Sequence, residues 1–373
     1  MMIKNLAAGL MGAALAAWVA PAAAQTKAIV IGYELPLTGD SSHYGEVFRN
    51  AADIKLQEFK DAGGLPGASI AVRYEDSKND AKEGRNIAQL FVDDKSIVGV
   101  LGDFNSTVSM AAAEIYAKAG VPQLSQTASH PDFVKISKWQ FRNITTQAYE
   151  GPFNAAWARE KGVTKATVVA IQNDWGLSCA SNFAEAFKAK GGEVLSTEYF
   201  NPGTRDFRSI LTKINRAAPD ALYLCMFYED GASFLQQRQQ LGNTAQLFGA
   251  SSLFEDQLVK LAGPAANGLF LSSNFVPTNP DANVQKFVSE YKAKYGAVPN
   301  QFAAQAYDAM GIMLAAITKV GPNATRDSLR DALAETKDYP GVTGVTTFDP
   351  ATREPQKTVV RMNIANGVYE VVK

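Results

Sequence analysis

The stretch "IVGVLGDFNSTVS" (residues 97–109) joins a short apolar run to a turn of small polar residues and then to a helical pattern. The same order returns at 28–46, 121–133 and 166–178. Parallel strands need helical crossovers, and the loops after their carboxyl ends line the crevice in which open α/β sheets bind ligands. The repeated order therefore predicts an α/β protein with parallel sheets. Its turns carry hydroxyls, backbone N–H groups and aromatic rings, which can hold a small molecule.

The first two dozen residues have the composition of a secretory signal. Lys4 supplies a positive charge and residues 6–20 an apolar stretch, which Ala22-Ala23-Ala24 follows as a small-residue cleavage site. The apolar stretch is shorter than the about twenty residues that a membrane-spanning helix needs. The residue directly after the cleavage site is Gln25 and not a cysteine, so a lipid anchor is not expected. We therefore expect residues 1–24 to be cleaved on export and the mature protein to reach a bacterial periplasm or the medium.

Charge and length narrow the classes of protein further. The 373 residues include 36 lysines and arginines and 37 aspartates and glutamates. Loss of the signal removes Lys4 and no acid, so 35 basic residues face 37 acidic ones in the mature chain. This balance argues against binding of nucleic acid, which requires a basic face, and gives no reason to expect binding to an anionic membrane. The length exceeds the size at which one hydrophobic core stops growing, so two domains are expected.

Strand and helix patterns alternate through two successive stretches of the chain. In the first, the expected strands are 28–35, 69–74, 97–101 and 121–124, and the expected helices are 44–62, 80–94 and 106–119. In the second, the expected strands are 166–171, 193–199, 221–226, 247–249 and 268–271, and the expected helices are 176–190, 205–215 and 230–241. Strands spaced by helical patterns of this length indicate βαβ units.

Three segments depart from this alternation. Residues 141–146 (FRNITT) are extended and β-branched, and they lead to Glu150-Gly151-Pro152 before a new helix. Helical patterns then dominate at 282–295, 301–320 and 325–335. The final segment, from Gly341 onward, predicts a β-ribbon with a hairpin signal at Asn366-Gly367.

Of the two cysteines, Cys179 lies in the first turns of a predicted helix that follows one strand, and Cys225 lies near the end of another predicted strand. An oxidising compartment permits a disulfide between them. A bridge requires Cα atoms within about 7 Å, which the sequence does not show. Two buried free thiols are an equal alternative.

Several motifs in order resemble one known family. They are "GYELPLTGDSSHYGE" (32–46), "KDAGGLPG" (60–67), "YEDSKNDAKEGRNIAQLFVDDKSIVGVLGDFNSTV" (74–108), "PQLSQTASHP" (122–131) and "FRNITT" (141–146). Together they resemble type I periplasmic solute-binding proteins of the leucine/isoleucine/valine-binding group, which deliver ligands to ABC importers. The resemblance covers essentially the whole mature chain.

The resemblance implies two Rossmann-like lobes joined by three hinge crossings, near Ile144, Phe275 and Gly344. Lobe 1 would comprise residues 25–144 and 276–344, and lobe 2 would comprise 145–275 and 345–373. It also implies a monomer that closes over a small carboxylate in the cleft and passes it to permease subunits in the inner membrane. No cofactor is expected.

In this family the turns after two strands of lobe 1 bind the ligand carboxylate. One matching turn contains Ser106 and Thr107, at a helix N-terminus whose N–H groups attract an anion. Ser106 could instead only cap its own helix. The second turn contains Thr127 and Ser129, which could also form an ordinary polar turn. Tyr44 matches a tyrosine of the cleft wall or, alternatively, packs into the core.

Lobe 2 would supply aromatic side chains. Trp175 and Phe227 match positions at which the family often has a tyrosine, and Tyr149 is a nearby candidate. Aromatic walls bury much area at a low cost in side-chain entropy and can stack on a planar ligand. The alternative is that these rings belong to the core.

One position departs from the family's pattern. Amino-acid binders of this group place a glutamate after a strand of lobe 2 to hold the ligand ammonium, and here Ser251 stands at that position. A buried ammonium without a carboxylate partner is costly. Glu229, Asp230 or Glu255 could replace it, although none aligns. The ligand is thus expected to be an amino acid, or an aromatic or other apolar carboxylate without an ammonium.

Catalysis is not expected. The two histidines, His43 and His130, lie in separate loops, so no HExxH spacing exists, and Walker A and G-x-S-x-G patterns are absent from the sequence. No catalytic or metal-binding residue is therefore assigned. A periplasmic sensor of the same fold, which signals to a membrane receptor, stays an alternative to an importer's receptor, and a hydrolase is disfavoured.

Overall fold

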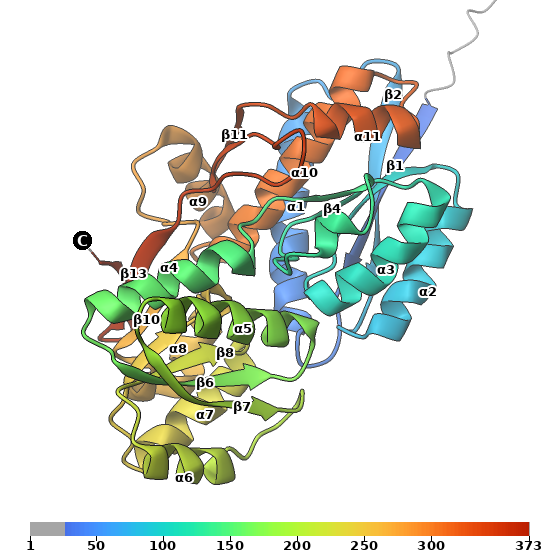
Figure 1. Cartoon of the computed structure of the whole chain (residues 1–373). Coiled ribbons are helices and arrows are strands. Elements are labelled where there is room, and N and C mark those ends of the chain that lie inside the picture. Colours follow the sequence, from blue (N-terminus) through green and yellow to red (C-terminus); the bar gives the residue numbers. More distant parts are fainter. Residues whose placement is uncertain (1–26, 373) are drawn as a thin grey trace, which may run out of the picture.

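The computed structural model describes residues 27–372, so the signal peptide predicted at 1–24 lies outside the described residues. The chain forms two α/β lobes, each built on its own sheet (Figure 1). This confirms the predicted α/β class with parallel sheets.

Lobe 1 is built on a five-stranded parallel sheet in the order β2-β1-β3-β4-β5. Its strands are β1 (Lys27–Leu35), β2 (Ala68–Asp76), β3 (Ile97–Leu101), β4 (Gln123–Ser125) and β5 (Gln140–Arg142). Helix α1 packs on α10, and α2 packs on α3. The helices are α1 (Ser42–Asp61), α2 (Ala81–Asp93), α3 (Ser106–Ala119), α9 (Ala282–Tyr295), α10 (Gln301–Val320) and α11 (Arg326–Ala334).

Lobe 2 is built on a seven-stranded sheet in the order β14-β13-β10-β9-β8-β6-β7. Five strands are parallel, namely β6 (Lys165–Ile171), β7 (Glu193–Phe200), β8 (Ala221–Cys225), β9 (Gln246–Gly249) and β10 (Leu269–Ser273). The antiparallel strands β13 (Val360–Ala365) and β14 (Val368–Val371) complete it. The helices are α4 (Gln147–Glu160), α5 (Asp174–Ala189), α6 (Arg208–Ala217), α7 (Tyr228–Gln240) and α8 (Asp256–Ala262).

Local sequence signals placed most elements correctly. The observed bounds of β3, α3, α9 and α10 are those expected from the sequence. The hairpin predicted at Asn366-Gly367 joins β13 to β14, with φ values of 51° and 75° at the two turn residues. Such positive φ values are what a tight hairpin requires, and Asn and Gly tolerate them.

The start of α4 was predicted wrongly. The sequence placed a new helix after Glu150-Gly151-Pro152, whereas α4 begins at Gln147 and contains Pro152. A Cβ at Gly151 would lie 2.7 Å from the backbone of Asn182, so α4 packs closely on α5 at this point. This tertiary contact outweighs the usual tendency of Pro to end a helix. As a result, Gln147 and Glu150 lie on the first turns of a helix.

The chain passes between the two sheets three times. The connecting segments are residues 143–146, 274–281 and 347–359. The third lies after Gly344, because β12 (Gly344–Thr346) pairs with β11 (Tyr339–Gly341) in a hairpin. The sequence pattern predicted a single β-ribbon in this region, whereas the structure has two separate antiparallel pairs, β11–β12 and β13–β14.

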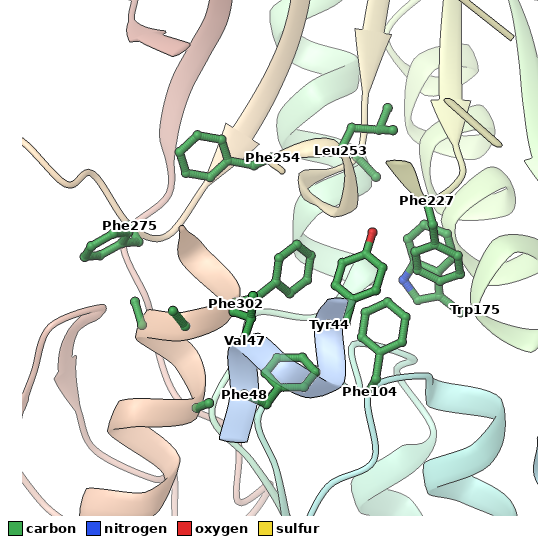
Figure 2. Packing of buried hydrophobic residues seen from close by; sticks show 14 of the residues in the cluster. Tyr44, Val47, Phe48, Phe104, Trp175, Phe227, Leu253, Phe254, Phe275 and Phe302 are labelled. Carbon is green, nitrogen blue, oxygen red and sulfur yellow. The ribbon is translucent and has the colours of Figure 1, made fainter. Parts of the chain in front are cut away.

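Aromatic rings from both lobes meet between the sheets. Tyr44 and Phe302 of lobe 1 lie close to Phe104, and Phe104 in turn contacts Phe227 of lobe 2 at a ring-centroid distance of 5.0 Å (Figure 2). One large cluster of buried apolar residues contains side chains from both lobes. The two lobes are therefore in direct contact around this region.

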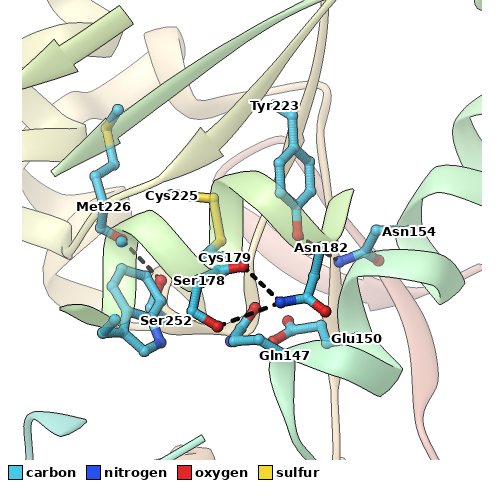
Figure 3. Close-up of a disulfide and its surroundings, with 12 residues drawn as sticks. Gln147, Glu150, Asn154, Ser178, Cys179, Asn182, Tyr223, Cys225, Met226 and Ser252 are labelled. Atoms are coloured by element: carbon cyan, nitrogen blue, oxygen red, sulfur yellow. Dashed lines mark hydrogen bonds between the residues drawn. A yellow bond between two sulfur atoms is a disulfide. The ribbon is translucent and has the colours of Figure 1, made fainter. Parts of the chain in front are cut away.

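The question left open for the cysteines is resolved by the fold. Cys179 on α5 and Cys225 at the end of β8 form a disulfide, with their Cα atoms 6.0 Å apart (Figure 3). Both are buried. The bridge joins a helix to a strand of the same lobe, next to the carboxyl edge of the sheet.

Candidate functional site

A cavity lies between the two lobes, at the carboxyl ends of their parallel strands. Its volume is about 30 Å³, so the lobes leave little open space between them here. It is lined by Phe104, Asn105, Ser106, Thr127, Ser129, Ile144, Gln147, Trp175, Phe227, Ser251, Ser252, Gln301 and Phe302. Six of the nine residues predicted to bind a ligand are in this wall: Ser106, Thr127, Ser129, Trp175, Phe227 and Ser251.

The turn between β3 and α3 forms one side of the cavity. It begins at Gly102, whose φ is 106°, and a Cβ there would lie 2.1 Å from the carbonyl oxygen of Glu34, so only glycine fits. Asn105 caps α3, because its side chain accepts a hydrogen bond from the N–H of Thr107 at 3.0 Å. Ser106 is therefore not the cap, and its hydroxyl oxygen accepts a bond from the N–H of His130 at 3.3 Å. The first turn of α3 thus brings N–H groups and a hydroxyl to the cavity.

The loop after β4 supplies two more hydroxyls. Thr127 donates its proton to the carbonyl oxygen of Phe104 at 2.8 Å, which ties the two loops of lobe 1 together. Ser129 Oγ accepts hydrogen bonds from Trp175 Nε1 at 3.1 Å and from Gln147 Nε2 at 3.2 Å. With both lone pairs occupied, the Ser129 hydroxyl can act toward the cavity only as a donor.

Two stacked aromatic rings form the opposite side of the cavity. Trp175 and Phe227 lie with ring centroids 4.8 Å apart and an interplanar angle of 23°. Trp175 is placed by the first turn of α5, which lies directly on the end of β6: a Cβ at Gly176 would be 2.0 Å from the carbonyl oxygen of Ile171. The disulfide joins α5 to the end of β8, two residues before Phe227.

Three predicted site residues do not line the cavity. Tyr44 lies behind Phe104, with ring centroids 4.1 Å apart, and its hydroxyl oxygen accepts a bond from the N–H of Tyr228. Thr107 points to the rim, where its hydroxyl accepts a bond from the N–H of Asp174 at 3.2 Å. Tyr149 is half exposed on the outer face of α4, so the structure does not bring it to this cavity.

Ser251, which stands where the family's glutamate is expected, begins a short 3₁₀ segment (Ser251–Leu253) after β9. Its N–H donates to Glu150 Oε1 at 2.5 Å, and its carbonyl oxygen accepts from the amide of Gln301. Glu255, a possible substitute, accepts instead from His43 Nε2 at 3.0 Å and from Asn300 Nδ2 at 2.5 Å. Its carboxylate is therefore occupied away from the cavity.

The other two acids lie in a separate hollow at the rim of the cleft. Burial raises the pKa of Glu229 to about 8 and that of Asp230 to about 7. Asp230 Oδ1 lies 3.4 Å from Arg205 Nη1, and Arg205 Nη2 lies 2.8 Å from Asp40 Oδ2 of lobe 1. Among the described residues, no ionisable side chain lines the ligand cavity.

Sequence reasoning missed several wall residues. Gln147 was missed because it was read as part of a loop before α4. Gln301 and Phe302 begin α10, whose bounds were predicted correctly, but nothing in the sequence indicates that this helix starts beside the cleft. An N-cap signal at Asn300, which accepts from the N–H of Ala303, marks the helix start without marking its surroundings.

No helix within residues 27–372 is long and apolar enough to cross a membrane. The same residues contain no group of three or more His, Cys, Asp or Glu side chains that could hold a metal ion. Two lobes with parallel sheets that enclose a polar and aromatic cavity define a bilobed solute-binding protein.

Comparison with known proteins agrees with this class. Residues 28–367 match the periplasmic binding protein family, and the chain belongs to that family. Proteins of this family bind small molecules rather than convert them. The resemblance to the leucine/isoleucine/valine-binding group is confirmed by the relatives that follow.

A Leu/Ile/Val-binding protein homologue from Brucella melitensis is 25% identical over 340 residues, 91% of each chain. A crystal structure from Rhodospirillum rubrum, named as a candidate branched-chain amino acid ABC transporter, is 50% identical, with a TM-score of 0.70 over 92% of this chain and 100% of that one. The isoleucine complex of LivJ from Streptococcus pneumoniae is 28% identical, with a TM-score of 0.86 over 93% of this chain and 99% of that one.

Proposed function

We propose that this protein is the periplasmic receptor of an ABC importer and that its ligand is a small carboxylate with an uncharged, apolar or aromatic body. The observation that carries the choice of ligand is the chemistry of the cavity wall. The wall contains amides, hydroxyls and aromatic rings, and no ionisable side chain among the described residues.

The carboxylate end is assigned to lobe 1. The first turn of α3 presents the positive end of the helix dipole, and Ser106 of this turn lines the cavity. The hydroxyl of Ser129 can only donate toward the cavity, which suits an anionic acceptor. These groups bind an anion without a buried cation.

The body of the ligand is assigned to the aromatic side of the wall. Trp175 and Phe227 on lobe 2 line the cavity together with Phe104 and Phe302 on lobe 1. Rings in this arrangement can stack on a planar group or enclose a branched aliphatic one. An ammonium in the same place would lose water and gain no carboxylate partner, which is costly.

Closure of the lobes would trap the ligand. In the structure, contacts cross the cleft from Ser129 to Trp175 and from His43 to Glu255. The Rhodospirillum chain superposes less closely than LivJ despite its higher sequence identity. We attribute this difference to a different angle between the lobes, as hinge closure would produce.

The remaining parts of the proposal follow from the family and the sequence. The mature protein would begin at Gln25 after cleavage of the signal, diffuse as a monomer and dock on permease subunits in the inner membrane. Its lobes would comprise 25–144 with 276–346 and 145–275 with 347–373, because the third crossing follows Thr346.

Calorimetry on the mature protein with paired ligands tests the proposal. The pairs are leucine with 4-methylpentanoate and phenylalanine with 3-phenylpropanoate. We expect both deaminated acids to bind at least as tightly as the amino acids, because the amino acids bring an unmatched ammonium. Tight leucine binding with no binding of 4-methylpentanoate would overturn the choice of ligand. If no carboxylate binds at all, the proposal that the protein is a receptor for carboxylates is wrong.

A further inference from the structure

Gln147 is the first residue of α4, directly after the first crossing between the lobes. Its side chain lines the ligand cavity, yet the residue is only 1% exposed. It thus belongs to the wall of the closed cleft, although its type and position gave no sequence signal for ligand binding.

The orientation of the Gln147 amide is fixed by its neighbours. Its Nε2 donates to Glu150 Oε2 at 2.9 Å and to Ser129 Oγ at 3.2 Å. A carboxylate oxygen can only accept, so the NH₂ group must face Glu150. A flipped amide would place two acceptors against each other.

Glu150 is itself held firmly. Its Oε1 accepts from the N–H of Ser251 at 2.5 Å and from the hydroxyl of Ser272 at 2.7 Å, and the residue is 3% exposed. Gln147 and Glu150 lie next to each other near the disulfide (Figure 3). With three protein donors on its two oxygens, Glu150 is committed to positioning Gln147 rather than to binding a ligand.

This arrangement leaves Gln147 Oε1 without a hydrogen-bond partner within residues 27–372, although the atom is buried. A buried carbonyl oxygen without a partner is unfavourable, and its residue lines the cavity. A donor on the ligand would satisfy this atom. The wall then has two complementary points, because Ser129 can only donate and Gln147 Oε1 can only accept.

We propose that Gln147 is a specificity-determining residue that accepts a hydrogen bond from a hydroxyl on the ligand. The inference rests on the proposed carboxylate-binding function. Since one amide joins Oε1 to the nitrogen that contacts Ser129, the ligand hydroxyl lies close to its carboxylate, as in a 2-hydroxy acid. A neutral hydroxyl fits better than an ammonium, because the wall offers no full negative charge.

The test compares ligands that differ only at the carbon next to the carboxylate. Phenylacetate, mandelate and phenylglycine carry hydrogen, hydroxyl and ammonium there, and 4-methylpentanoate, 2-hydroxy-4-methylpentanoate and leucine form the aliphatic set. By calorimetry, we expect the wild-type protein to bind each hydroxy acid at least about tenfold more tightly than the acid without a hydroxyl.

Two variants separate a specific role of Gln147 from a general one. Gln147→Met keeps the side-chain length and removes the acceptor. The ratio of the affinity for the hydroxy acid to the affinity for the acid without a hydroxyl should therefore fall toward one. Gln301→Met is the matched control: Gln301 also lines the cavity, but its amide is paired with Ser251 and Ser273. This control should lower all affinities together and keep the preference. Thermal unfolding of each variant verifies that it is folded.

Glu150→Gln tests the positioning role. A second amide at this place can present a donor to Gln147 and remove the constraint on its orientation, so the hydroxyl preference should shrink while binding of phenylacetate persists. A preference that survives in Gln147→Met, or wild-type affinities equal across each set, would overturn the inference while leaving the receptor intact. Tightest binding of leucine and phenylglycine, lost in Gln147→Met, would overturn the assignment to a hydroxyl. Failure of every carboxylate to bind would overturn the proposed function itself.

Discussion

In each lobe, the helix that follows the first strand begins with a similar strand-to-helix turn, called here a corner. In lobe 1, His43-Tyr44-Gly45 lies in the first turns of α1, after strand β1. In lobe 2, Asp174-Trp175-Gly176 opens α5, after strand β6. A Cβ at Gly45 would lie 2.0 Å from the carbonyl oxygen of Pro36, and a Cβ at Gly176 would lie 2.0 Å from that of Ile171. Each glycine thus allows its helix to start directly on the end of a central strand.

The two corners differ in what lies above the aromatic ring. Phe104 stacks on Tyr44 and keeps it from the cavity, whereas Trp175 lines the cavity with Phe227 beside it. A disulfide supports the corner of lobe 2 alone. Local sequence thus determines where the aromatic residue before the glycine is placed. Whether that ring can contact a ligand depends on a loop from elsewhere in the chain, such as the loop that carries Phe104.

The largest expected effect is a loss of stability on removal of the disulfide in lobe 2. Cys179→Ser combined with Cys225→Ser frees a loop with a sequence separation of 46 residues. The chain-entropy estimate for a loop of this length is a loss of about 4 kcal/mol of stability at 25 °C. Denaturant unfolding of the oxidised wild type and the double variant measures this loss, and hydrogen exchange should locate the increased opening in lobe 2. Identical unfolding midpoints would contradict the assigned bridge.

The next effect concerns the two glycines. Gly45→Ala and Gly176→Ala each force a backbone carbonyl away from a new Cβ, so each should cost about 3 kcal/mol of stability. Only Gly176→Ala should also displace Trp175 from the cavity and weaken ligand binding beyond its effect on stability. Chemical unfolding and calorimetry on both variants make the comparison. Equal losses of affinity would show that the two corners are equivalent after all.

The aromatic residues themselves give a smaller difference. Trp175→Ala removes one ring of the cavity wall, and its effect should be larger for phenylacetate than for 4-methylpentanoate by about 0.5–1.5 kcal/mol. Tyr44→Phe removes only the acceptor for the N–H of Tyr228 and should leave both affinities unchanged. Calorimetry with the two ligands checks this. A loss of affinity in Tyr44→Phe would place Tyr44 nearer the ligand than its packing indicates.

The smallest expected effect is a dependence of closure on pH. Burial lowers the pKa of His43, and the positive charge of Lys260 lowers it further. The hydrogen bond to Glu255 across the cleft and the negative charges of Glu255 and Glu46 raise this pKa. Together these effects leave the pKa of His43 above its ordinary value. A histidine with a raised pKa in the closed form stabilises closure fully below its ordinary value, and the contribution is lost as pH rises through the raised value. Ligand affinity should therefore fall as pH rises above about 6.5.

Variants of both histidines sharpen this prediction. His43→Gln should abolish the fall in affinity, measured by calorimetry from about pH 5.5 to about pH 8.5, a range that includes the ordinary histidine pKa of about 6.5. His130→Gln is the control, because its ring bonds within its own loop and burial lowers its pKa. A slope that persists in His43→Gln would assign the effect to another group.

The sequence by itself determined the class of fold and much of one half of the site. Strands and helices follow from periodicity, and the turn with Ser106 comes after a strand whose bounds were predicted correctly. The anion-binding character of that turn is local, since it arises from the N–H groups of a single helix start. Nearby residues suffice to encode it.

Tertiary structure decided the rest. The start of α4 depends on its packing against α5, so Gln147 and Glu150 could not be placed on a helix from local signals that include Pro152. The carboxylate of Glu255 accepts hydrogen bonds from His43 and Asn300, which belong to the other lobe and lie more than forty residues away in sequence. Periodicity and turn chemistry report on neighbours along the chain, whereas the charge and the free acceptor of the cavity are set by hydrogen bonds that form only when distant segments meet.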